Sequence, residues 1–125
     1  MNSKVFMVLR ILLGLLVLVF GSNKFFDFLP PFEGLSAEAG SYFGALISSK
    51  TLMLVGIVEI AAGLALIFNK FGALMAVILM SVAVNAVLFH ATLDPGNIGP
   101  AIGFLVLNII ALYGYRDKYA GMLAG

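Results

Sequence analysis

The apolar run from residue 51 to residue 69, TLMLVGIVEIAAGLALIFN, constrains the fold more than any other stretch of the chain. A membrane-spanning helix needs about 20 mostly apolar residues, so this run is long enough to cross a bilayer. It nevertheless carries a carboxylate, Glu59, near its middle. An ionisable group at that depth is costly unless it is paired, neutralised or turned toward a polar cavity. The sequence therefore predicts that other helices surround Glu59.

Two glycines support that prediction. Gly56 and Gly63 lie on the same helical face as Glu59, three positions before it and four positions after it. Small residues on one face let a neighbouring membrane helix approach closely. We therefore expect the face that carries Glu59 to be the most tightly packed face of this helix.

Composition indicates that the solvent of this chain is a bilayer. Of its 125 residues, 62% are hydrophobic and 10% are charged, whereas a soluble domain is about half apolar and about a quarter charged. A chain this short cannot bury so much apolar surface in its own core. We predict an all-α fold, an integral membrane four-helix bundle that forms a single domain over residues 1–125. The expected spans are about 5–22, 51–69, 71–93 and 98–115.

Composition also excludes several kinds of function. The net charge is +1, so no strongly basic surface points to nucleic acid. The chain has no cysteine, which removes thiolate catalysis and cysteine metal ligation. A single histidine excludes a metal site built from several histidines of one chain. The six methionines fit adaptable filling of apolar helices rather than copper ligation. We expect no metal and no intrinsic cofactor.

The only long connection, residues 23–50, predicts an irregular segment followed by a short helix. Pro30 and Pro31 prevent a continuous helix, and Ser36 offers an N-cap. An apolar stripe at helical spacing follows, made of Ala39, Tyr42, Phe43, Leu46 and Ile47. The pattern favours an amphipathic helix on the membrane surface or over the mouth of the bundle. An ordered loop with an accidental stripe is the alternative.

Lysine and arginine residues predict the orientation. One side carries Lys4, Arg10, Lys70, Arg116 and Lys118, and the other carries Lys24 and Lys50. By the positive-inside rule, both termini and the turn at Lys70 lie in the cytoplasm, and the long first loop faces outward. Lys24 and Asp27, near the outer end of the first span, are expected to be solvated and unconnected with any chemistry.

Four polar side chains within the spans are candidates for a buried polar or proton-handling site: Arg10, Glu59, Asn85 and Asn108. In one interpretation Arg10 and Glu59 form a buried ion pair that only holds the helices together, with Asn85 and Asn108 satisfying the remaining lone pairs. In a second, Glu59 handles protons. In a third, Glu59 is neutral and merely hydrogen-bonded.

The single histidine gives a separate candidate site near the outer end of the third span. His90 is either a partly wetted, satisfied side chain or a hydrogen-bond donor to a quinone carbonyl. In the second interpretation Phe89 lies beside the ligand, and Tyr42 and Phe43 cover it from the short helix. An apolar pocket with a few polar groups is the usual form of a ligand site.

The ordered set of these features resembles the DoxX family of small bacterial membrane proteins. The resemblance is carried by RILLGLLVLVFGSNKF from Arg10, with Gly14, Gly21, Lys24 and Phe25, by GIVEIAAGLAL around Glu59, by NAVLFH at 85–90, and by residues 107–119. It implies a four-helix bundle in the bacterial cytoplasmic membrane. It also implies a link to quinone, since the family includes the small subunit of a thiosulfate:quinone oxidoreductase and partners of membrane redox complexes.

Three hypotheses for function follow. The first is a subunit or accessory of a quinone-linked membrane oxidoreductase, with the lipid bilayer and other subunits of a redox complex as partners. The second is a non-catalytic structural or assembly partner. The third is a small-solute or proton pathway, which needs a homo-oligomer because four helices leave little room for a pore. The glycine pairs Gly14/Gly21 and Gly99/Gly103 are candidate self-association faces. Whether the chain is itself an enzyme stays open.

Overall fold

The computed structural model describes residues 1–125 and is helical without strands, as predicted. Its helices are α1 (Ser3–Phe26), α2 (Ala37–Ser48), α3 (Thr51–Phe68), α4 (Gly72–Leu93), α5 (Gly99–Gly114) and α6 (Ala120–Leu123). Two short 3-10 helices, η1 (Pro95–Asn97) and η2 (Arg116–Tyr119), flank α5. Helices α1, α3, α4 and α5 coincide with the four apolar runs.

Three of these helices, α1, α3 and α4, are long and apolar enough to cross a membrane. The fourth apolar run is interrupted: α5 has 16 residues, about 24 Å at 1.5 Å per residue. It is followed by the segment Arg116–Leu123, which bends away by 71°. The chain therefore has three candidate spans, or four if this bent pair counts as one span. These helices make it a membrane protein.

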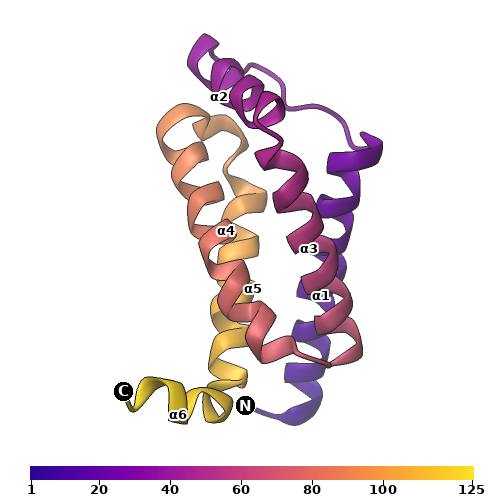
Figure 1. Cartoon of the computed structure of the whole chain (residues 1–125), viewed down its shortest axis with the longest axis vertical. Coiled ribbons are helices and arrows are strands. Elements are labelled where there is room, and N and C mark those ends of the chain that lie inside the picture. Colours follow the sequence, from indigo (N-terminus) through magenta and orange to yellow (C-terminus); the bar gives the residue numbers. More distant parts are fainter.

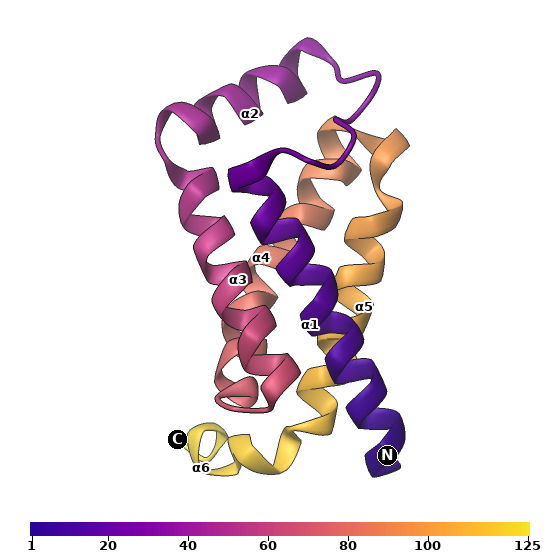
Figure 2. The same ribbon diagram turned by 90° about the vertical axis from the view of Figure 1, so that its right-hand side faces the viewer.

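The long helices run alongside one another, and α2 crosses one end of them (Figure 1). Both chain termini lie at the opposite end, where α6 folds across the base (Figure 2). We call these the α2 end and the terminal end. Because α3 and α4 are joined by the short turn at Asn69 and Lys70, they run antiparallel, as expected.

Helix α2 begins where the sequence predicted. The Ser36 hydroxyl accepts a hydrogen bond from the Ala39 N–H at 3.1 Å and so caps the helix. Ala39 is fully buried and Phe43 is half-buried, whereas Ile47 is 60% exposed. Only part of the predicted apolar stripe is therefore covered by the rest of the chain.

Glycines set the distance between α1 and α3. A methyl group built on Gly63 would lie 2.8 Å from the carbonyl oxygen of Gly14, and one on Gly21 would lie 2.8 Å from that of Gly56. Real side chains do not tolerate such contacts, so the two backbones touch only because all four residues are glycine. The prediction of a closely approached face at Gly56 and Gly63 is confirmed. Gly14 and Gly21 pack against this face within the chain, so they are not available for self-association.

Candidate functional site

Arg10 does not contact Glu59. Its Nη1 donates to the carbonyl oxygens of Leu66 and Ile67, the second at 3.1 Å. These carbonyls belong to the last turn of α3, where a helix leaves its final C=O groups without internal partners and carries a partial negative charge. Arg10 is 8% exposed, so it caps the C-terminus of α3 from a neighbouring helix. The predicted Arg10–Glu59 ion pair is wrong.

Lys24 is the partner of Glu59. Its Nζ lies 2.6 Å from Oε1 of Glu59, and the two side chains are 20% and 3% exposed respectively. The contact is an ion pair rather than an aligned hydrogen bond, because Oε1 accepts no hydrogen bond of proper geometry. Lys24 also donates to Phe20 O at 3.4 Å. The expectation that Lys24 is solvated and unconnected with the interior is therefore wrong.

The glycine contacts explain this exchange of partners. Gly14 packs on Gly63 and Gly21 packs on Gly56, so α1 and α3 are antiparallel in a fixed register. That register places Arg10 opposite the last turn of α3. Side chains on a helix lean toward its N-terminus. Arg10 therefore leans toward the terminal end, away from Glu59, whereas Lys24 leans inward from the α2 end and Glu59 leans outward to meet it.

The two asparagines lie apart from this ion pair. Asn85 is exposed on α4, and its Nδ2 donates to Ser81 O of the same helix at 2.8 Å. Asn108 is fully buried between α5 and α4, and its Nδ2 donates to Ala76 O at 3.0 Å. The Oδ1 of Asn108 has no hydrogen-bond partner. Neither asparagine satisfies Glu59, so the four predicted polar residues lie in four separate places.

The predicted histidine group does come together at the α2 end. The Phe89 ring contacts those of Tyr42, Phe43 and His90, with centroids 4.9 Å apart in each case. Tyr42 and Phe89 are stacked, with 18° between their planes. Phe32, which the sequence did not single out, lies edge-on to His90 at 5.2 Å. We call these five residues the aromatic cluster.

Asp94 holds the imidazole of His90 in place. Both residues are buried, and Nδ1 of His90 lies 3.1 Å from Oδ2 of Asp94, one helical turn further along. Asn97 donates from Nδ2 to the same carboxylate at 3.0 Å. Since a carboxylate only accepts, Nδ1 carries the proton, and Nε2 of a neutral His90 is an acceptor. Asp94 was missed, although its spacing of four residues from His90 at a helix end was a usable signal.

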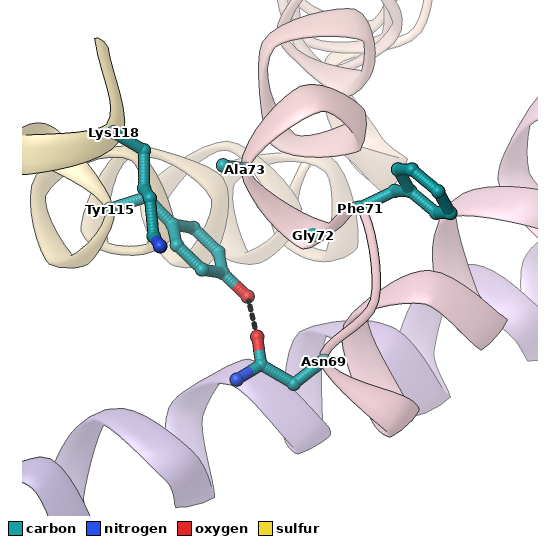
Figure 3. A pocket seen from close by; sticks show the side chains of 6 residues that line it. All are labelled: Asn69, Phe71, Gly72, Ala73, Tyr115 and Lys118. Carbon is teal, nitrogen blue, oxygen red and sulfur yellow. Dashed lines mark hydrogen bonds between the residues drawn. The ribbon is translucent and has the colours of Figure 1, made fainter. Parts of the chain in front are cut away.

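A different arrangement closes the terminal end (Figure 3). The Tyr115 hydroxyl donates to Oδ1 of Asn69 at 2.6 Å, and the Tyr119 hydroxyl donates to Ala73 O at 2.7 Å. Beside the first bond is an open hollow of about 280 Å³, lined by Asn69, Phe71, Gly72, Ala73, Tyr115 and Lys118. None of its lining residues was predicted as a site. Both tyrosines serve to tie η2 and the end of α5 to the α3–α4 turn.

Comparison with known proteins gives one finding. A family model described as DoxX matches residues 5–91, which is well over half of the chain. The matched stretch contains Lys24, Glu59 and His90, whereas Asp94 and Asn108 lie beyond it. No match was found among curated proteins or among solved structures.

Proposed function

The chain belongs to the DoxX family, and from that premise we propose that it is a membrane subunit or accessory of a quinone-linked oxidoreductase. We place the quinone ring at the α2 end, against His90. The observation that supports this most is the His90–Asp94 pair set among the rings of Phe32, Tyr42, Phe43 and Phe89.

The proposal includes an arrangement in the membrane. Helices α1, α3, α4 and α5 are the four spans of a bundle, and α2 is an amphipathic helix on the outer surface. The terminal end faces the cytoplasm of a bacterial cell, because it carries Lys4, Lys70, Arg116 and Lys118, against Lys24 and Lys50 at the α2 end. The aromatic cluster then lies at the outer interface, at the depth that a quinone head group reaches from the hydrocarbon.

Aromatic side chains suit a planar ligand. Stacked and edge-on ring pairs contribute about 0.5–1.5 kcal/mol each beyond their area burial. The rings of the aromatic cluster already contact one another, so an incoming ring must replace one of these contacts. Tyr42 is 39% exposed and belongs to α2, so the Tyr42–Phe89 stack is the contact that a quinone ring opens at least cost, by entering between the two rings and stacking on both.

The His90–Asp94 pair supplies the polar chemistry. Neutral His90 accepts a hydrogen bond at Nε2, which fits the hydroxyl of the reduced quinol rather than the carbonyl of the quinone. When Nε2 takes the quinol proton, the Asp94 carboxylate stabilises the imidazolium that forms. In the reverse direction the imidazolium donates its Nε2–H to a quinone carbonyl oxygen. The chain thus binds the ring and moves a proton, while the electrons are exchanged with a redox centre of another subunit.

Binding of two soluble quinols, ubiquinol-1 and menadiol, kept reduced in the absence of oxygen, tests this site. Titration calorimetry on the purified protein in detergent micelles should give saturable binding of at least one of them. His90→Phe should raise the Kd about tenfold, which is about 1.4 kcal/mol, because the ring contacts remain and the hydrogen bond is lost. Asp94→Asn should raise the Kd about threefold, and Tyr42→Leu should also weaken binding.

Phe28→Leu is the matched control for Tyr42→Leu. Phe28 is 55% exposed at the same end of the protein and is not part of the aromatic cluster, so its replacement should leave the Kd unchanged. Absence of binding to the unaltered protein, or equal affinity of the His90→Phe variant, would contradict the quinone site. An equal loss in the Phe28→Leu and Tyr42→Leu variants would show non-specific partitioning into the micelle.

A structural or assembly role is the second candidate, and the interhelical contacts favour it. Arg10, Lys24 and Tyr119 each tie two separate helical elements together through partners within the chain. A protein of this kind would bind no quinone but would be needed for a partner complex to accumulate. In that case His90→Phe would leave the assembled amount of the complex unchanged, whereas Lys24→Met would lower it.

A further inference from the structure

The outward face of α4 is unlike the outward faces of α1 and α3. Its exposed residues include six at alternating intervals of four and three: Leu74, Ile78, Ser81, Asn85, Leu88 and Thr92. This interval is that of a left-handed helix pair, in which such residues form the contact. We call these six residues the α4 seam. Two of its central members are polar, although α4 is a candidate membrane span.

The corresponding faces of α1 and α3 carry no polar side chain. On α1 the exposed residues at this spacing are Val5, Val8, Leu12, Leu15 and Val19, and on α3 they are Leu54, Ile57, Ala61, Leu64 and Phe68. Lipid tails can cover such apolar faces without leaving a polar group unpaired. The spacing alone is therefore common to outward faces, and the polar pair Ser81 and Asn85 is what distinguishes α4.

Asn85 is incompletely satisfied within its own chain. Its Nδ2 donates to Ser81 O at 2.8 Å, which uses one of two N–H groups, and Oδ1 receives no hydrogen bond from the chain. Asn85 lies eight residues before the end of α4 at Leu93, about 12 Å along the helix at 1.5 Å per residue. A side chain as short as asparagine does not reach water from there. An amide left unpaired in hydrocarbon costs several kcal/mol.

We propose that the α4 seam binds the α4 seam of a second copy of this chain, with the Asn85 side chains hydrogen-bonded to each other. Copies of one membrane protein insert in the same direction, so a two-fold pair brings two parallel α4 helices together, and each seam residue meets its own counterpart. A carboxamide is self-complementary, because the free N–H of one copy donates to Oδ1 of the other. A single asparagine in such a contact also fixes register and number of helices.

This interface leaves the quinone site free. His90 and Phe89 are buried and point into the protein, whereas the α4 seam lies on the exposed side of the same helix. The dimer therefore does not depend on the proposed function. Loss of dimerisation without loss of quinone binding, or the converse, would separate the two proposals.

Cysteine cross-linking tests the α4 seam cleanly, because the chain has no cysteine of its own. In membrane vesicles treated with copper phenanthroline, Leu88→Cys should give a disulfide-linked dimer, since a seam residue meets its counterpart at a separation that a disulfide spans. Leu64→Cys, on the exposed face of α3, is the matched control and should stay monomeric. Adding Asn85→Leu to Leu88→Cys should reduce the cross-linked fraction at least fivefold.

Three results would overturn the proposal. Leu88→Cys would cross-link no more than Leu64→Cys, or Asn85→Leu would leave the cross-linked fraction unchanged, or Gly103→Cys on α5 would cross-link in place of Leu88→Cys. The last result would assign self-association to the exposed glycines Gly99 and Gly103. Circular dichroism and thermal unfolding of the Asn85→Leu variant should show that the monomer fold is intact, because Asn85 is exposed and lies outside the core.

Discussion

The two ends of the α1–α3 contact hold a cation in opposite ways. At the terminal end, Arg10 donates to the backbone carbonyls of Leu66 and Ile67. At the α2 end, Lys24 pairs with the carboxylate of Glu59. Both cations belong to α1 and both acceptors to α3. The same helix contact therefore stabilises one cation with backbone carbonyls and the other with a carboxylate.

The difference indicates where protonation can change. A backbone carbonyl does not titrate, so the Arg10 contact is the same at any pH that the protein meets. A carboxylate does titrate, and the α2 end holds two of them in buried pairs, Glu59 with Lys24 and Asp94 with His90. The terminal end is closed by neutral tyrosine hydrogen bonds. Of the two ends of the α1–α3 contact, only the α2 end therefore has an acceptor whose charge can change with pH.

The largest effect is expected where both ends are broken at once. Gly63→Ala would place a methyl group 2.8 Å from Gly14 O and 2.9 Å from the Leu18 side chain, which forces α1 and α3 apart. We expect a loss of about 3 kcal/mol in the free energy of unfolding, the upper part of the usual range for overpacking. Titration with SDS in mixed micelles, followed by circular dichroism, measures it.

Gly103→Ala is the control for this variant. No atom lies within 4 Å of a methyl group at Gly103, so the same substitution should leave stability unchanged or raise it slightly through helix propensity. Equal stabilities of the two alanine variants would show that close packing of α1 on α3 does not hold the fold.

Much of this contact could be predicted from the sequence. Long apolar runs define helices in a membrane because each backbone group must be bonded within its own segment, and the four runs are helical. The serine cap of α2 and the glycine face beside Glu59 also follow from local chemistry. These features depend on residues a few positions apart, which is the range over which a sequence can be interpreted without coordinates.

The partners across helices could not be predicted in the same way. Arg10 and Glu59 were paired because depth alone allowed it, but pairing depends on helix register and on the direction in which side chains lean. One signal was present: Gly14 and Gly21 have the same spacing as Gly56 and Gly63. Because these two apolar runs follow each other along the chain and so run in opposite directions, this spacing indicates their register. With that register, Lys24 rather than Arg10 reaches Glu59. Phe32 was missed because it lies in the irregular segment before α2, where periodicity gives no guidance.

A smaller effect is expected when only the α2 end is broken. Lys24→Met should leave Glu59 buried without a cation. Removing one partner of a buried pair costs about 3–5 kcal/mol, and the partial exposure of Lys24 reduces our expectation to about 2 kcal/mol. The double variant Lys24→Met/Glu59→Gln should recover most of this loss, because no unpaired charge remains. A double-mutant cycle in the same SDS titration measures the coupling, and a coupling near zero would mean that the ion pair contributes nothing to folding.

The smallest effect is expected at the terminal end, from Arg10→Lys. The variant keeps the positive charge near the C-terminus of α3, where the helix dipole favours it. It loses the guanidinium geometry by which one group reaches two carbonyls at once. We expect a loss of about 1 kcal/mol in the free energy of unfolding, since one hydrogen bond to a charged group is exchanged for a less well placed one.

Because the carbonyl acceptors do not titrate, this loss should be the same at pH 6 and pH 8. A loss in Arg10→Lys that varies with pH would mean that a titrating partner exists at the terminal end, and the contrast between the two ends would then be wrong.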